Sequence, residues 1–173
     1  MLFRSRLRGR TIAVGVFVNE PLASLSEIVR TSGVKMVQFH GEESPAYVNR
    51  TARFRPAIKA FRVGPRFRLS ALRPYRKFVK AFLLDGKVAG LRGGTGMQFD
   101  WAIAKKARKF GAVFLAGGLK PENVREAILA AVPDFVDVAS GVETRPGKKD
   151  AAKLRMFFGE VESARRILSR KKK

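Results

Sequence analysis

Two glycine-bearing segments follow apolar runs in the second half of the chain and have the composition of a phosphate site. Gly117 and Gly118 follow the run 112–116, and Ser140 and Gly141 follow the run 135–139. Glycine lets backbone N–H groups approach an anion, and a short helix after such a turn directs its positive end there. A Gly-Gly pair can also simply close a tight turn. Because two consecutive runs end this way, we predict a phosphate site and a phosphorylated small-molecule ligand.

Three ionisable side chains lie inside or directly after apolar runs of the sequence. Asp85 follows the run 78–84, where its carboxyl group could act as a general acid if its pKa were raised, or cap a loop. His40, the only histidine, follows the run 34–39 and is expected on the same rim, although a lone histidine is more often structural. Asp137 lies inside the run 135–139 and is expected to bond neighbouring backbone or side chains.

Composition excludes several other kinds of chemistry. The 173 residues include no cysteine, so the sequence offers no disulfide, no thiolate zinc site and no cysteine nucleophile. No apolar run approaches the ~18 residues of a membrane-spanning helix, and the first residues lack the apolar segment of a secretory signal. We therefore expect no membrane contact and take the cytoplasm as the default location.

The chain is strongly basic, with 36 Lys and Arg, 14 Asp and Glu, and a net charge of +22. The excess is concentrated in segments 4–10, 50–80 and 165–173, none of which contains an acid. Solvated helix faces and a frayed tail are the favoured explanation, and a stripe that binds polyanions is the alternative. We predict that residues 1–10 are a basic extension and residues 165–173 a basic tail, with nucleic acid a possible but less favoured partner.

Short apolar runs alternate with amphipathic segments, which predicts parallel strands joined by helices and therefore an α/β fold. A complete (β/α)₈ barrel needs ~250 residues, so a chain of this length accommodates five to six units. We predict an incomplete barrel of about six βα units over residues 11–164. The expected strands are 11–18, 34–39, 57–63, 78–84, 112–116 and 135–139. The expected helices are 22–33, 44–53, 66–77 (poor and proline-interrupted), one capped by Asp100, one beginning at Pro121, and 150–168.

The chain contains, in this order, VGVFVN (14–19), VQFHGEE (37–43), LLDG (83–86), GGTGMQFDW (93–101), VFLAGGLKPENV (113–124) and VDVASGVETRPGKKD (136–150). In order and spacing these motifs resemble phosphoribosylanthranilate isomerase, over residues 12–161. The resemblance implies a (β/α)₈ barrel of tryptophan biosynthesis. Such an enzyme converts N-(5-phosphoribosyl)anthranilate into the carboxyphenylamino-deoxyribulose phosphate by an Amadori rearrangement, without cofactor or metal.

The resemblance also implies roles for individual residues. Asp85 matches the general acid that protonates the ribose ring oxygen, and His40 stays on the active-site rim. The family's general base is a cysteine on its first strand, and an arginine on a following loop holds the anthranilate carboxylate. Neither segment is present in this sequence, so we expect the chain as given to be nearly inactive. The residues that match the phosphate-binding loops are Gly117, Gly118, Ser140 and Gly141.

Two departures from the family remain. Met97 stands where the family usually has a lysine, and the run 11–18 matches the family's third strand, so two βα units are absent. Such a piece would expose the edges of its first and last strands. Three explanations stay open: a misassigned start or frameshift, units supplied by a second chain or by dimerisation, or a remnant of the enzyme. The alternative function is that of a non-catalytic basic remnant that binds RNA or other polyanions.

Overall fold

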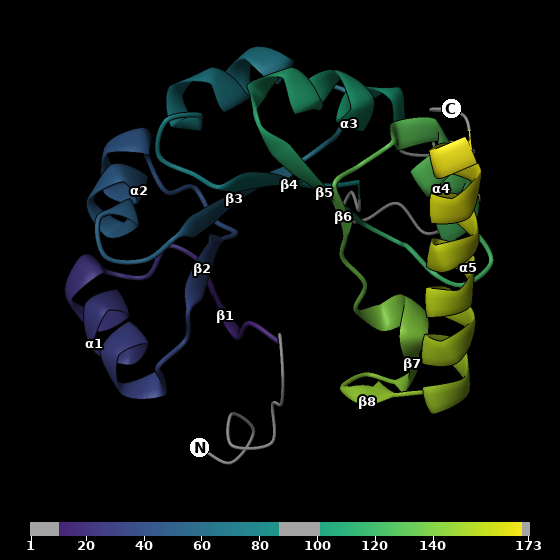
Figure 1. Ribbon diagram of the computed structural model, residues 1–173. Coiled ribbons are helices and arrows are strands. Elements are labelled where there is room, and N and C mark those ends of the chain that lie inside the picture. The colour runs from purple at the N-terminus through teal and green to yellow at the C-terminus, as the bar shows by residue number, and fades with distance from the viewer. Residues whose placement is uncertain (1–10, 87–100, 171–173) are drawn as a thin grey trace.

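The computed structural model describes residues 11–86 and 101–170, which form an arc of six strands with helices around its outer side (Figure 1). Every pairing within this sheet is parallel, and the strands lie side by side in chain order. The predicted α/β architecture of an incomplete barrel is confirmed. The strands are β1 (Val14–Phe17), β2 (Met36–Phe39), β3 (Ala57–Arg62), β4 (Ala81–Asp85), β5 (Ala112–Ala116) and β6 (Phe135–Val136).

The connections between strands are helical and cover one face of the sheet (Figure 1). They are α1 (Leu22–Ser32), α2 (Pro45–Ala52), the 3₁₀ helix η2 (Leu69–Tyr75), α3 (Trp101–Ala107) with η3 (Arg108–Phe110), and α4 (Val124–Ala131). After β6 come η4 (Ser140–Val142), a short antiparallel hairpin of β7 (Glu143–Arg145) and β8 (Lys148–Lys149), and the long helix α5 (Ala151–Arg170).

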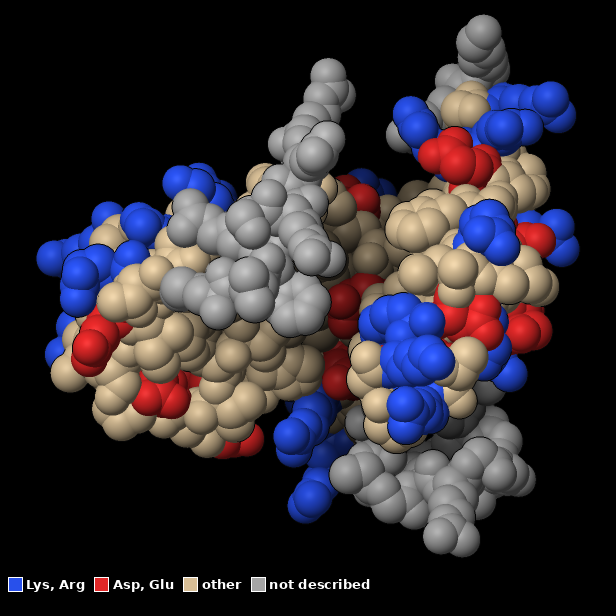
Figure 2. Space-filling model, turned by 90° about the horizontal axis from the view of Figure 1, so that it is seen from below, with Lys and Arg blue, Asp and Glu red and all other residues tan. Residues whose placement is uncertain are grey.

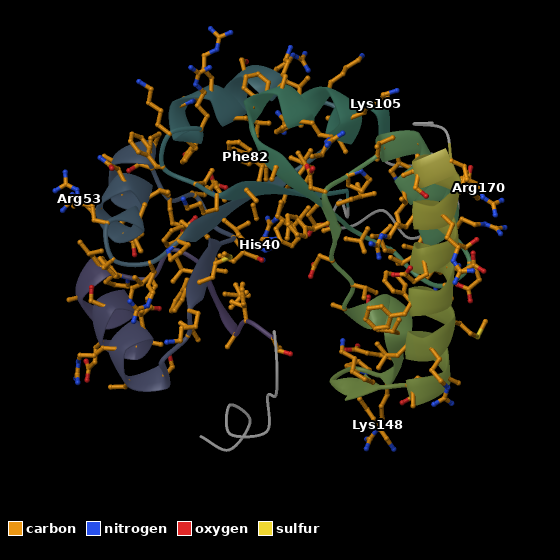
Figure 3. The ribbon with its side chains drawn as sticks, in the orientation of Figure 1. His40, Arg53, Phe82, Lys105, Lys148 and Arg170 are labelled. Atoms are coloured by element: carbon orange, nitrogen blue, oxygen red, sulfur yellow. The ribbon has the colours of Figure 1, made fainter. Side chains whose placement is uncertain are left out.

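Side chains along each strand point alternately to the outer face of the sheet, toward the helices, and to its inner face. On β4, Phe82 and Leu84 belong to the large core between sheet and helices, and Figure 3 shows Phe82 pointing that way. Leu83 belongs to a smaller inner cluster with Ile58, Ala60, Ala81 and Ala116. Because side chains alternate with a period of two, Asp85 lies on the inner face like Leu83.

The two edge strands leave apolar inner-face side chains exposed. Within the described residues β1 pairs only with β2, and β6 pairs only with β5. Val16 is 59% exposed and Val18 is 61% exposed, while Phe135 is 50% exposed although its ring stacks on Phe114 with 4.4 Å between centroids. In a closed barrel the same positions would face a filled interior. The arc is therefore open between β1 and β6, as expected from the sequence.

Several predicted boundaries were wrong, each for a local reason. The last strand ends at Val136 rather than residue 139, because the chain turns into η4. The segment 66–77 forms only the 3₁₀ helix η2, which has Pro74 inside it. Helix α4 begins at Val124 instead of Pro121, because the Asn123 side chain first bonds Lys120 N–H and the Gly118 carbonyl.

The predicted basic tail also differs from the structure. Residues 165–170 continue α5 to Arg170, and Leu168 packs against the main core. Apolar side chains at helical spacing therefore extend the helix through the basic segment. The extension 1–10, residues 171–173, Asp100 and Met97 lie outside the described residues. In the described ranges no helix has the length and apolar character needed to cross a membrane.

Candidate active site

The predicted acid and the predicted rim histidine lie together at the carboxyl ends of the strands. β3 separates β2 from β4, with Phe39 opposite Lys59 and Arg62 opposite Asp85 in the register. His40 follows β2 on the inner side of the arc, as Figure 3 shows. Its Nε2 lies 3.5 Å from Asp85 Oδ2, and both side chains are about one-fifth to one-quarter exposed. The structure thus brings His40 and Asp85 into contact.

A glutamine orients the histidine ring. The side-chain amide nitrogen of Gln38 lies 3.1 Å from His40 Nδ1, and the His40 N–H donates to the Phe17 carbonyl at 2.8 Å. Contacts at the ring and at the backbone therefore hold His40 beside Asp85.

Asp137 is a further ionisable residue at this end of the sheet. Its N–H donates to the Leu115 carbonyl at 2.8 Å, as part of the ladder to β5. Partial desolvation of its carboxyl group raises the pKa of Asp137, although the residue is exposed, and the negative charge of Asp85 raises it further, against the effects of His40 and Lys149. Asp85 and Asp137 lie at the ends of β4 and β6, with only β5 between them, and two carboxyl groups at one end of a sheet disfavour double ionisation.

A buried ion pair lies behind this cluster and was not anticipated. Lys59 of β3 and Glu43 after β2 have side chains 3% and 2% exposed, with Nζ 3.2 Å from Oε2. Lys59 also donates to the carbonyls of Gly41 at 2.8 Å and Ala60 at 3.0 Å. Glu43 accepts from the N–H groups of Asn19 and Gly41. The pair therefore ties the ends of β1, β2 and β3 together.

A pocket of about 400 Å³ opens beside His40, at the carboxyl ends of β1, β2 and β3. Arg62, Lys59 and Tyr75 contribute to its wall together with His40 and Asn19. Figure 2 looks into the open side of the arc and shows acidic side chains in the hollow between its two halves. The site is thus a mixed-charge hollow rather than a uniformly basic one.

The predicted phosphate segments begin with two glycines in left-handed conformations. Gly117 has φ 93° and Gly118 has φ 68°, so both positions favour glycine. The Asn123 amide donates to the Gly118 carbonyl at 3.0 Å and its oxygen accepts from Lys120 N–H at 2.9 Å, which fixes the turn. Within residues 11–86 and 101–170, the N–H groups of Gly117 and Gly118 donate to no protein acceptor. They are available to an anion.

The second phosphate segment packs directly on the first. Gly141 lies so close to the Leu119 carbonyl that a Cβ would overlap it. Ser140 begins the 3₁₀ helix η4, and Lys149 Nζ donates to the Ala139 carbonyl at 2.8 Å. The structure therefore brings both predicted segments together at the same end as Asp85. Among the described residues no cluster of three or more His, Cys, Asp or Glu side chains has the arrangement of a metal site.

Comparison with known proteins agrees with this geometry. A sequence profile described as N-(5'phosphoribosyl)anthranilate (PRA) isomerase matches residues 4–160. The N-(5'-phosphoribosyl)anthranilate isomerase of Geobacter metallireducens is 48% identical over 150 residues, which are 87% of this chain and 72% of that protein. Its Geobacter sulfurreducens counterpart is 46% identical over 145 residues, 84% of this chain and 70% of that protein.

Solved structures give the same result. The crystal structure of phosphoribosyl anthranilate isomerase from Thermotoga maritima matches with a TM-score of 0.82 and 37% identity, over 92% of this chain and 77% of that one. A phosphoribosyl anthranilate isomerase in complex with reduced 1-(o-carboxyphenylamino)-1-deoxyribulose 5-phosphate matches with a TM-score of 0.78 and 34% identity, over 92% and 75%.

Proposed function

Because this chain belongs to the N-(5'-phosphoribosyl)anthranilate isomerase family, we propose that it carries the acid and phosphate-binding half of that enzyme's active site. The reaction is the isomerisation of N-(5-phosphoribosyl)anthranilate to 1-(2-carboxyphenylamino)-1-deoxyribulose 5-phosphate in tryptophan biosynthesis. The biosynthetic role of the relatives supports the cytoplasm as its compartment.

Asp85 is the general acid in this proposal. The observation that carries it is the 3.5 Å approach of His40 Nε2 to the Asp85 carboxyl group, at the same sheet end as the paired glycine segments. An acid at this position donates its proton to the ribose ring oxygen as the ring opens, and general acids of this kind contribute about 10²–10⁴ in rate. The raised pKa of Asp137 extends the pH range in which its carboxyl group is neutral, which limits the negative charge around Asp85.

The substrate phosphate binds to the joined segments after β5 and β6. Support comes from the left-handed turn at Gly117 and Gly118, their available N–H groups, and the packing of Gly141 on Leu119. Ser140, the first residue of η4, is exposed and can donate its hydroxyl group to a phosphate oxygen. These contacts hold the charged end of the substrate while the ribose reaches Asp85.

The general base is supplied by residues outside this sequence, which contains no cysteine. The open edges of β1 and β6 support closure of the arc by further polypeptide, from a second copy or a complementing chain. One relative from Thermotoga maritima is itself described as dimeric. Light scattering of the purified chain tests this partner: a dimer or higher assembly is expected, and a stable monomer at all concentrations contradicts it.

Turnover of phosphoribosylanthranilate, followed by its fluorescence, tests the function. The purified chain should be about 10²–10⁴ slower than a complete relative, because one acid–base partner is missing. Asp85→Asn should lower the activity further by a similar factor, whereas the exposed control Glu126→Gln on α4 should leave it unchanged. Near-normal activity of the unmodified chain would overturn the assignment of the base, and an active Asp85→Asn variant would overturn that of the acid.

A further inference from the structure

The amino ends of four neighbouring strands of the sheet carry cations without acids. Four segments lead into the amino ends of β2, β3, β4 and β5, namely 33–35, 53–56, 76–80 and 108–111, and none contains Asp or Glu. The cations of these four segments are here named the amino-end rim. Its members are Lys35, Arg53, Arg55, Arg76, Lys77, Lys80, Arg108 and Lys109.

The opposite end carries acids as well as cations. Six carboxylate side chains lie at or after the carboxyl ends of the strands, where the candidate active site is. They are Glu20, Glu42, Glu43, Asp85, Glu122 and Asp137. The amino-end rim is therefore a purely cationic edge, separate from the mixed-charge site that handles the substrate.

The cations of the rim are close neighbours along one edge. Parallel strands lie about 4.8 Å apart, so the segments before β2, β3, β4 and β5 follow one another in an arc. Arg55 Nε donates to the Val34 carbonyl at 3.2 Å, which joins the first two segments. Every rim side chain except Arg55 is exposed.

Few acidic side chains balance the positive charge of the amino-end rim. Arg108 pairs with Asp134 at 2.9 Å, and hydrogen bonds from Arg108 and the Val113 N–H outweigh burial and lower the pKa of Asp134. The other seven rim cations form no ion pair within the part of the chain that the structure describes. Such a row of unpaired cations attracts a partner with regularly spaced negative charges.

Two pockets with aromatic walls lie between the rim cations. One, of about 650 Å³, is lined by Arg73, Pro74, Arg76, Lys77, Lys109 and Phe110, and Lys109 Nζ lies 5.3 Å from the centroid of the Phe110 ring. The other, of about 240 Å³, also includes Lys77, with Arg53, Phe78 and Lys80 in its wall. Cations beside rings and guanidinium planes are the combination that binds phosphates and stacks bases of single strands.

We propose that the amino-end rim binds single-stranded nucleic acid, with its lysines and arginines on successive phosphates and bases entering the pocket beside Phe110. A lipid surface fits less well, because the rim is interrupted by two recesses rather than flat. An unstructured polyanion such as polyphosphate would use the cations but not the rings. The binding is independent of the isomerase reaction, since Asp85 lies at the other end of the sheet.

Fluorescence anisotropy with a labelled single-stranded RNA of about 12 nucleotides tests the proposal. The rim variant is Arg76→Gln/Lys77→Gln/Lys80→Gln/Lys109→Gln. The matched control, Arg66→Gln/Lys106→Gln/Arg145→Gln/Lys148→Gln, also removes four positive charges, from exposed positions outside the rim. Circular dichroism verifies that both variants keep the helical signal of the parent chain.

The salt dependence gives the decisive readout. Loss of four phosphate contacts should make the slope of log K against log salt shallower by about 3, and weaken binding about a hundredfold near 0.15 M salt. The control should keep the parent slope and bind within about threefold of the parent, because its charges contact no phosphate. Equal weakening in both variants would show an effect of net charge alone and overturn the proposal, as would absence of binding by the parent chain at this salt concentration.

A second comparison distinguishes contacts with the bases from contacts with the phosphates. Phe110→Leu keeps an apolar side chain against the core but removes the ring, so affinity should fall about fivefold with no change in salt slope. Polyphosphate of equal charge should compete about tenfold less well than the RNA. Equal competition, or tighter binding to vesicles of anionic lipid, would overturn the assignment to nucleic acid.

Discussion

The buried Lys59–Glu43 pair provides the sharpest test of how the site is held in place. Replacing Glu43 by Gln keeps the side-chain length and an acceptor oxygen for the N–H groups of Asn19 and Gly41. It leaves the ammonium group of Lys59 buried, with backbone carbonyls as partners and without a negative charge beside it. The variant therefore isolates the loss of one charge at the junction of β1, β2 and β3.

The expected loss of stability is large. Removing one partner of a buried ion pair costs about 3–5 kcal/mol, because an uncompensated charge stays in a poorly solvated place. We expect a value near the lower limit, about 3 kcal/mol, since the Gly41 and Ala60 carbonyls still accept from Lys59 at 2.8 and 3.0 Å. The exposed pair Arg165–Glu162, with side chains 77% and 54% exposed, is the control. Glu162→Gln should change stability by less than about 0.5 kcal/mol.

The loss should also depend on pH in a defined direction. Burial lowers the pKa of Lys59, and the charge of Glu43 partly opposes that shift, so Glu43→Gln lowers the pKa further. When the folded pKa is below the unfolded one, the unfolded chain binds more protons between the two values, and stability rises with pH. The deficit of the variant should therefore shrink as pH rises from the folded pKa of Lys59 in the variant to its folded pKa in the parent, both below the ordinary value of about 10.4.

Equilibrium urea unfolding measures both effects. The double variant Lys59→Met/Glu43→Gln should be more stable than Glu43→Gln alone, because it removes the buried charge. A deficit below about 1 kcal/mol for Glu43→Gln, or one that does not change with pH, would refute the argument that this pair is a desolvated ion pair.

Three further outcomes are expected. Gly141→Ala should lower the free energy of unfolding by about 1–3 kcal/mol, because the added methyl group overlaps the Leu119 carbonyl. Gly159→Ala, at a position in α5 where no atom lies near an added Cβ, should instead raise the free energy of unfolding by about 0.5–1 kcal/mol. Thermal unfolding measures both variants, and stability changes of the same sign for the two would contradict the close packing of Gly141. The raised pKa of Asp137 means that its folded form holds the proton longer, so its contribution to stability falls as pH rises from about 4 through that pKa. Urea unfolding across this range should show that Asp137→Asn removes the decline, and an unchanged slope would contradict the raised pKa.

The strand pattern predicted most of the sheet, because each strand is a short apolar run that ends at a polar residue. It also predicted that His40 and Asp85 share a rim, since both follow such runs. Their contact required more: the register places Arg62 opposite Asp85, and the curvature of the arc brings side chains across β3. Local sequence preferences predict neither the register nor the curvature of the sheet.

Other features depend on partners distant in sequence. Lys59 lies in a strand that otherwise reads as apolar, and only its approach to Glu43 and three carbonyls explains why a cation is tolerated there. The end of β6 and the hairpin β7–β8 were missed because their strands are two or three residues long. The hairpin turn does contain Gly147 at φ 79°, which was the available local signal.

The acid and phosphate-binding half of the proposed site does not depend on closure of the arc. Asp85 ends β4 and Gly117 follows β5, and both strands are paired on each side. The segment at Ser140 follows an edge strand, but the stacking of Phe135 on Phe114 and the fit of Gly141 on Leu119 hold it to β5. The acid and phosphate half is thus fixed by contacts within the described residues. The chain should therefore bind a phosphorylated substrate analogue by calorimetry even where turnover is absent, and failure to bind would show that this half, too, requires closure of the arc.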